Sequence, residues 1–301
     1  MTGSVATHSR RRALGALWRR RPALRGYALI SPALLVMIAA LLSPFLLLAG
    51  QSFVVETGPD AWELGLANYQ DFFDKPQYVR VLLRSVGIST LVAIATVLLA
   101  YPAAYFIAFH IHRNKMAWML LITLPFWTSY LLRVFAWKLI LGFNGVVNSG
   151  LIWLGLIDQP LEFLLYNTFA VVLTLAHAWA AFAILPIYVS LQKIDRSLIE
   201  AALDLGENPV ETFLRVTLPL SLPGVVAALL LVFIPTVGDY VTPKLVGGPN
   251  GIMIGSIIQV AFGRLDNWPL GAAISFVSML TVTAAVCAFL LAVGRIKRWR
   301  Q

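Results

Sequence analysis

Aromatic side chains that can bind an organic cation recur, together with one arginine, at helical spacing within one apolar stretch. They are separated by four, three and four positions: Phe126, Tyr130, Arg133 and Trp137. In one continuous helix they would share a face, where aromatic rings can attract cations. Arg133 would repel a cation, so we expect it to pair with a carboxylate or to contact backbone. The pattern predicts a cavity wall, or aromatic rings that pack between helices while Arg133 extends outward or forms an ion pair.

A carboxylate lies near the end of another apolar stretch. Asp239 follows Gly238 and Pro235, which interrupt helices. Helix breaks inside a membrane are tolerated where the backbone lines a cavity or is buried in protein. There Asp239 can attract an amine. The alternatives are an ion pair with Arg133 or a cap for the next segment.

Metal, redox and hydrolytic chemistry have little support. The single cysteine, Cys287, supports neither a disulfide nor a cysteine-rich metal site. His177 has no ligand partner at useful spacing, so we expect a hydrogen-bonded structural histidine. No GxxxxGK[ST], HExxH or GxSxG motif occurs. We therefore expect no cofactor in this chain and no enzymatic activity.

The composition places these residues in a membrane. The chain is 59% hydrophobic and 12% charged, whereas soluble domains carry about 25% charged residues. Crossing a bilayer takes about 20 apolar residues, and six stretches approach or exceed that length: 27–49, 85–109, 117–141, 167–191, 222–240 and 268–293. We expect an all-α polytopic membrane protein. The sequences of the first three spans do not match those of the last three. Many secondary transporters are built from inverted repeats, in which such a match would be expected.

The basic residues indicate how the chain is oriented. If residues 1–26 lie in the cytoplasm, the inside segments hold sixteen Lys and Arg residues and the outside segments five. Basic residues concentrate on the cytoplasmic side, so both termini are expected inside. The expected units are a basic segment at 1–26, a six-helix domain at 27–293 and a basic tail at 294–301. Residues 1–26 would form a disordered tail or a helix lying on the membrane surface.

One long polar segment interrupts the second half of the chain. It lies at residues 192–221, is called the polar loop below, and contains EAALDLGENPVETFLRVTLP. We expect a helix from Ser197 to Leu205, capped by Asp195 or by Ser197 itself. Gly206 should then bend the chain, and Pro209 can start a second helix. Two later prolines, Pro219 and Pro223, should separate that helix from the fifth span.

The spacing within the polar loop is a recognisable signature. Glu-Ala-Ala is followed by three residues, Gly, nine residues, Val, one residue and Leu-Pro: Glu200, Ala201, Ala202, Gly206, Val216, Leu218 and Pro219. This resembles the loop by which permease subunits of ATP-binding-cassette importers dock onto their ATPase. The family usually has Ile where this chain has Val216.

The resemblance extends over nearly the whole membrane region. It is nearest to spermidine/putrescine permeases, through Leu124-Pro-Phe-Trp127 with Arg133 and through Gly238-Asp-Tyr-Val-Thr-Pro243. It implies the type I importer permease fold with both termini inside, and substrate import across the bacterial inner membrane. The pathway residues it suggests are Phe126, Trp127, Tyr130, Arg133, Trp137, Asp239 and Tyr240.

The family also implies an assembly. ATP and magnesium would be bound by an ATPase dimer, a second permease subunit would complete the pathway, and a periplasmic solute-binding protein would deliver the substrate. Permeases for opines, amino acid derivatives or organic anions share much of this pattern and remain alternatives. A stand-alone secondary transporter or channel, and last a membrane enzyme, are the rival classes.

Overall fold

The computed structural model describes residues 22–58 and 61–299. The arginine cluster between Arg10 and Arg21, and with it most of the predicted N-terminal unit, lies outside the described residues. The final helix runs without a break to Trp299, so most residues of the expected basic tail at 294–301 are helical.

The described residues contain six helical segments long and apolar enough to cross a membrane, as expected. Their helices are α2 (Pro22–Ser52), α4 (Pro76–Tyr105), α6 (Tyr130–Leu141) with α7 (Val146–Trp153), α8 (Thr168–Gln192), α11 (Leu218–Val237) and α13 (Trp268–Trp299). Shorter helices are α3 (Ala67–Asp74), α5 (Lys115–Thr123), α9 (Arg196–Asp204), α10 (Pro209–Thr212) and α12 (Ile254–Gly263). A small antiparallel hairpin, β1 (Val54–Gly58) and β2 (Ala61–Leu64), was not predicted.

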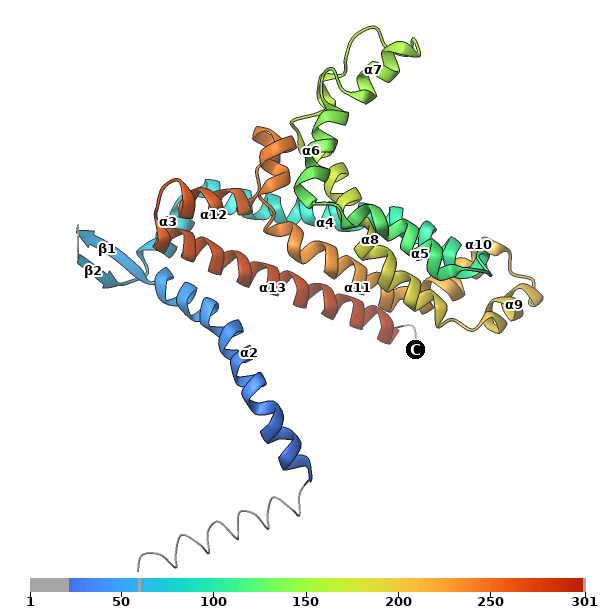
Figure 1. Ribbon diagram of the computed structural model, residues 1–301, viewed down its shortest axis with the longest axis horizontal. Coiled ribbons are helices and arrows are strands. Elements are labelled where there is room, and N and C mark those ends of the chain that lie inside the picture. Colours follow the sequence, from blue (N-terminus) through green and yellow to red (C-terminus); the bar gives the residue numbers. More distant parts are fainter. Residues whose placement is uncertain (1–21, 59–60, 300–301) are drawn as a thin grey trace, which may run out of the picture.

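The core is formed by α4, α8 and α11, which pack along one another (Figure 1). Fully buried side chains from all three meet there, including Val92, Leu175 and Val232. The end of the bundle with α9 and α10 lies opposite the end with the hairpin, α3 and α12 (Figure 1). Helix α2 diverges from the bundle, and α6 with α7 projects from the other side.

The third predicted span, 117–141, is wrong as a single helix. The chain forms α5, then a short 3₁₀ turn at Leu124–Trp127, and α6 starts only at Tyr130. Pro125 has no backbone N–H to continue the α-helix, and Thr128 is extended, with ψ 154°. Phe126 therefore does not share a helix face with Tyr130 and Arg133, and the predicted four-residue stripe does not exist as such.

The start of the fifth span also differs from the prediction. Helix α11 begins at Leu218, so Pro219 lies in its first turn and Pro223 lies inside it. Proline has no backbone N–H to donate, yet the helical path continues from Pro209 to Val237 through both prolines. A wider i→i+5 turn at Phe213–Thr217 joins α10 to α11. The two prolines thus do not separate the polar loop from the span.

The polar loop otherwise forms as predicted. Asp195 caps α9 by accepting a hydrogen bond from the Ser197 N–H at 3.0 Å. This bond lowers the pKa of the exposed Asp195 carboxyl, so the cap is present above the ordinary carboxyl pKa and is lost as the pH falls through the lowered value. Gly206 has φ +90°, a conformation that suits glycine. Asn208 and Glu211 then form a capping box on α10.

Helices α8 and α11 approach each other closely at Gly224. A Cβ atom there would lie 2.5 Å from the Pro186 carbonyl oxygen and 3.2 Å from the Ile187 Cα, and it would also meet Ser190. Most of the atoms that this Cβ would meet belong to the backbone of α8, so they cannot move away by a side-chain rotation. Small residues at such crossings let membrane helices pack tightly.

Gly224→Ala should lower the thermal stability of the detergent-solubilised chain, by about 1–3 kcal/mol, because overpacking forces α8 and α11 apart. The matched control is Gly87→Ala in α4, where a Cβ meets nothing within 4 Å and where alanine favours the helix. A Gly224 variant that melts at or above the Gly87 variant's temperature would contradict the packing argument.

Candidate functional site

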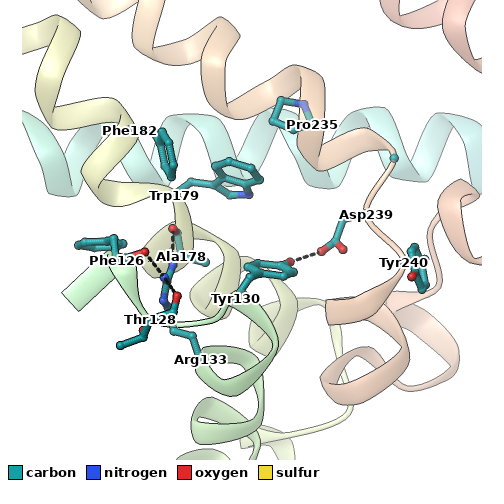
Figure 2. A pocket seen from close by; sticks show the side chains of 11 residues that line it. Phe126, Thr128, Tyr130, Arg133, Ala178, Trp179, Phe182, Pro235, Asp239 and Tyr240 are labelled. Carbon is teal, nitrogen blue, oxygen red and sulfur yellow. Dashed lines mark hydrogen bonds between the residues drawn. The ribbon is translucent and has the colours of Figure 1, made fainter. Parts of the chain in front are cut away.

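A cavity of about 380 Å³ lies between α6, α8 and the end of α11 (Figure 2). Its volume falls in the range of small-molecule sites, about 300–1,000 Å³. We call it the aromatic cavity. Its lining residues are Phe126, Thr128, Tyr130, Arg133, Ala178, Trp179, Phe182, Pro235, Gly238, Asp239 and Tyr240.

Asp239 is held at the cavity by the break that follows α11. The helix ends at Val237, and Gly238 follows as its C-cap. One Asp239 carboxylate oxygen accepts the Val241 N–H at 3.0 Å, which caps the next segment as one prediction proposed. The other oxygen accepts the Tyr130 hydroxyl at 2.7 Å (Figure 2). Each oxygen can still accept a further hydrogen bond from a ligand.

Tyr130 connects α6 to the segment after α11. Besides its bond to Asp239, its hydroxyl lies 2.6 Å from the buried Thr242 hydroxyl. Since the Tyr130 proton goes to Asp239, the Thr242 hydroxyl donates to the Tyr130 oxygen. This three-residue network fixes the position of the carboxylate relative to α6.

Arg133 binds backbone rather than a carboxylate. Its two terminal nitrogens donate to the carbonyls of Ala178, Phe126 and Thr128 at 3.0, 2.9 and 3.1 Å. The guanidinium also lies 5.0 Å from the centre of the Phe126 ring. The predicted backbone contact is therefore confirmed, and the alternative ion pair with Asp239 is absent. Two of these carbonyls, those of Phe126 and Thr128, lie in the break between α5 and α6, and the third belongs to α8.

Five of the seven predicted pathway residues line the cavity, and two do not. Trp127 is 78% exposed and lies outside it. Trp137 donates its indole N–H to His177 at 3.1 Å, and the two rings lie 5.4 Å apart. His177 is thus the hydrogen-bonded histidine that the sequence predicted.

Helix α8 supplies two aromatic residues that sequence reasoning missed, Trp179 and Phe182. Their i, i+3 spacing was visible in the sequence. However, the fourth span is apolar on every side, so no polar face indicated which residues point toward a cavity. Figure 2 shows Trp179 above Tyr130, with Arg133 and Asp239 on opposite sides of that tyrosine.

Two charged residues of opposite sign, Arg133 and Asp239, are the ionic groups of the lining. The rest is aromatic, apolar or uncharged. Within the described part of the chain no three His, Cys, Asp or Glu side chains gather to hold a metal ion. The cavity can therefore bind a small organic ion through an acceptor, a fixed cation and aromatic faces.

The polar loop lies at the opposite part of the bundle from the hairpin (Figure 1). On α9, Glu200 and Ala201 are exposed and Ala202 is buried. Leu218 and Pro219 are half-buried at the start of α11. The same two long helices, α8 and α11, run from this loop to the aromatic cavity.

Residues 81–299 match the family model described as binding-protein-dependent transport system inner membrane component. This chain belongs to that family. The permease is 35% identical to the spermidine/putrescine transport system permease protein PotB of Escherichia coli K12 over 257 residues, which cover 85% of this chain and 91% of that protein. The Haemophilus influenzae PotB is 35% identical, with 84% and 88% covered. The inner membrane ABC transporter permease protein YdcU of Escherichia coli K12 is 34% identical, with 77% of each chain covered.

Solved structures agree with this assignment at the level of the fold. A chain of a bacterial ABC transporter involved in import of the acidic polysaccharide alginate aligns with a TM-score of 0.69 and 19% identity, covering 95% of the permease and 99% of that chain. The same kind of transporter in complex with an alginate pentasaccharide-bound periplasmic protein aligns with a TM-score of 0.68 and 17% identity, covering 90% and 94%. The permease thus has the importer permease fold, and it is a multi-pass protein of the inner membrane.

Arg133→Lys should destabilise the permease by about 1–3 kcal/mol, because an ammonium group cannot reach three divergent carbonyls and leaves partly buried acceptors unpaired. Thermal unfolding in detergent measures the loss. Arg80→Lys is the matched control, since Arg80 is exposed and lies outside the cavity. Equal melting temperatures for the two variants would show that the carbonyl contacts contribute nothing.

Proposed function

We propose that this permease carries an organic amine through the aromatic cavity and that the polar loop transmits the work of a partner ATPase. The single observation that supports this best is the connection between the two sites. Helix α8 leads into the polar loop and helix α11 leads out of it, and both helices line the aromatic cavity. Motion imposed on the loop therefore acts directly on the cavity walls.

The shape of the polar loop supports docking on a partner. The α9 helix is short, capped at Asp195 and followed by a sharp bend at Gly206. Leu205 is 87% exposed at this bend, and Val210 on α10 is 66% exposed. Exposed apolar side chains beside a charged residue such as Glu200 are typical of a surface that meets another protein. The distribution of basic residues indicates that this surface lies in the cytoplasm, as do both termini.

The proposed partners are suggested by a sequence motif that this chain lacks and by an apolar surface that it exposes. It has no phosphate-binding loop, so ATP and magnesium would be bound by a separate ATPase dimer and not by this chain. The most apolar stretch of α2 has no buried side chain. Lipid and a second permease subunit, either another copy or a homologue, would cover it. A periplasmic solute-binding protein would dock at the end with the hairpin.

An amine substrate fits the cavity chemistry. The Asp239 carboxylate can accept hydrogen bonds from an ammonium group, and aromatic rings favour cations. Polyamines are the first candidates, because two of the three relatives named above are spermidine/putrescine permeases. Transport then requires that the loaded binding protein and ATP favour different arrangements of the helices. A secondary transporter would instead carry solute without ATP or companion proteins.

Glu200→Arg should abolish co-purification of the ATPase and ATP-dependent amine uptake, while membrane insertion stays normal. The reason is that a reversed charge at the centre of α9 opposes the partner's complementary surface. Pull-down through a tag on this chain and radiolabelled putrescine uptake measure the two effects. The control is Glu63→Arg on the hairpin at the opposite end, which should retain the ATPase. An ATPase that remains bound to the Glu200 variant and supports full uptake would exclude the docking role of α9.

A further inference from the structure

Helix α4 is attached to other elements at both of its ends, although the lining residues of the aromatic cavity come from other parts of the chain. One end contacts the polar loop and the other contacts the start of α12, and these two elements lie at opposite ends of the bundle (Figure 1). Between its ends α4 packs along α8 and α11 in the core. The four contacts described next show what this helix joins.

A cluster of aromatic rings attaches the second half of the polar loop to α4. The ring of Phe213, the first residue after α10, stands nearly perpendicular to the rings of Tyr101 and Tyr105, with centroid distances of 5.6 and 5.9 Å. The Tyr101 hydroxyl also lies 2.8 Å from the Ser221 hydroxyl on α11. Aromatic rings attract each other in this edge-to-face arrangement. A displacement of the turn after α10 is therefore resisted by α4.

The first half of the polar loop reaches the same end of α4. Arg196, the first residue of α9, donates from Nη2 to the Phe109 carbonyl at 3.2 Å. Phe109 lies in the wide i→i+5 turn, Phe106–His110, that follows α4. Arg196 Nη1 also lies 3.5 Å from His112 Nε2. Both halves of the polar loop are thus attached to one end of this helix.

The other end of α4 is attached to the start of α12. The buried Ser85 hydroxyl accepts the Ile254 N–H at 2.7 Å and donates to the Val81 carbonyl at 2.8 Å. Ile254 is the first residue of α12, and the first N–H groups of a helix have no acceptor within it. Ser85 therefore supplies one of the acceptors that the α12 N-terminus lacks.

The start of α12 lies directly against the backbone that carries Asp239. A Cβ atom at Gly255, the residue after Ile254, would lie 2.9 Å from the Asp239 carbonyl oxygen and closer still to the Gly238 carbonyl. Because this contact is formed by backbone atoms on both sides, neither side can yield by rotating a side chain. A shift of the α12 N-terminus therefore displaces the Asp239 backbone.

We propose that α4 is a rigid connection through which the polar loop sets the position of Asp239, and that Phe213 and Ser85 are the positioning residues at its two ends. The inference rests on the proposed function. From Ser85 to Tyr101 the helix rises about 24 Å, and a helix in a close-packed interior moves as a unit. Helices α8 and α11 reach the cavity walls, whereas α4 reaches the carboxylate through α12.

The test measures motion just before α12 and needs no transported solute. Ile252 is 40% exposed, and it is replaced by cysteine (Ile252→Cys) together with Cys287→Ser. Since Cys287 is the single cysteine of the chain, maleimide labelling of this chain, separated by electrophoresis, reports position 252 alone. The importer is purified from the source cells with its ATPase, placed in nanodiscs and labelled with and without ATP and vanadate. The readout is the ratio of the two labelling rates.

In this parent chain we expect the nucleotide to change the labelling rate about tenfold, which corresponds to about 1.4 kcal/mol of coupling free energy. Phe213→Leu removes the ring but keeps an apolar side chain, and Ser85→Ala removes the hydroxyl. Each should bring the ratio close to one while the ATPase still co-purifies. Phe213→Tyr, which keeps the ring, should restore the parent ratio.

Phe106→Ala is the matched control, because it removes an aromatic ring at the same end of α4. Phe106 is 51% exposed, and its ring stacks on His110. This variant should keep the parent ratio. Melting temperatures of all variants are measured in parallel. A residue with a structural role alone would lower the melting temperature or the yield of complex and leave the nucleotide-dependent ratio unchanged.

Four outcomes would overturn the inference. A parent ratio that is undiminished in either the Phe213→Leu or the Ser85→Ala variant refutes the connection through α4 and leaves the proposed importer intact. The same holds if the parent complex hydrolyses ATP without any change at position 252. Loss of the ATPase from the Phe213→Leu variant makes Phe213 a docking residue and refutes its assigned role. A parent chain that purifies without an ATPase refutes the proposed function, and the inference with it.

Discussion

The close contact between α8 and α11 is the constraint on which the rest of this structure depends. Gly224 lets the two helices approach until its hydrogen faces the backbone of Pro186 and Ile187. Because the interior of a protein is close-packed and resists compression, helices in such contact move together. One end of this pair bears the polar loop (Figure 1), and the aromatic cavity lies at the middle of α8 and the far end of α11. In the proposed function, this pair of helices carries motion from the polar loop to the cavity walls.

The cavity depends on two helix breaks whose polar groups are satisfied from elsewhere in the sequence. Unpaired backbone groups are costly at membrane depth. At the first break, between α5 and α6, Arg133 donates to carbonyls of the break and of α8. At the second, after α11, Asp239 accepts from Val241 and from Tyr130. Each ionic group thus joins its own segment to a neighbouring helix, which explains why neither needs the other as an ion-pair partner.

The polar loop could be predicted closely because its signals are local. An N-cap at Asp195, a bend at Gly206 and a helix start at Pro209 depend on residues within a few positions of one another. The number of spans, and the approximate positions of all but the third, were predictable for a similar reason, since length and apolar composition decide whether a segment can cross a bilayer. The third span shows the limit of that reasoning. Hydropathy continues through 117–141, but Pro125 and extended Thr128 divide the backbone.

The sequence by itself determined that the chain has six spans and a polar loop of defined shape, because composition, capping residues and local spacing are short-range properties of the chain. Its resemblance to importer permeases indicated the family. Only the tertiary structure decided which residues meet at the cavity. Trp179 and Phe182 enter it and Trp127 and Trp137 do not. In a helix that is apolar on every side, hydrophobicity does not distinguish a face toward lipid from a face toward protein. Packing against neighbouring helices makes that choice, and it brings together residues more than a hundred positions apart, such as Tyr130 and Asp239.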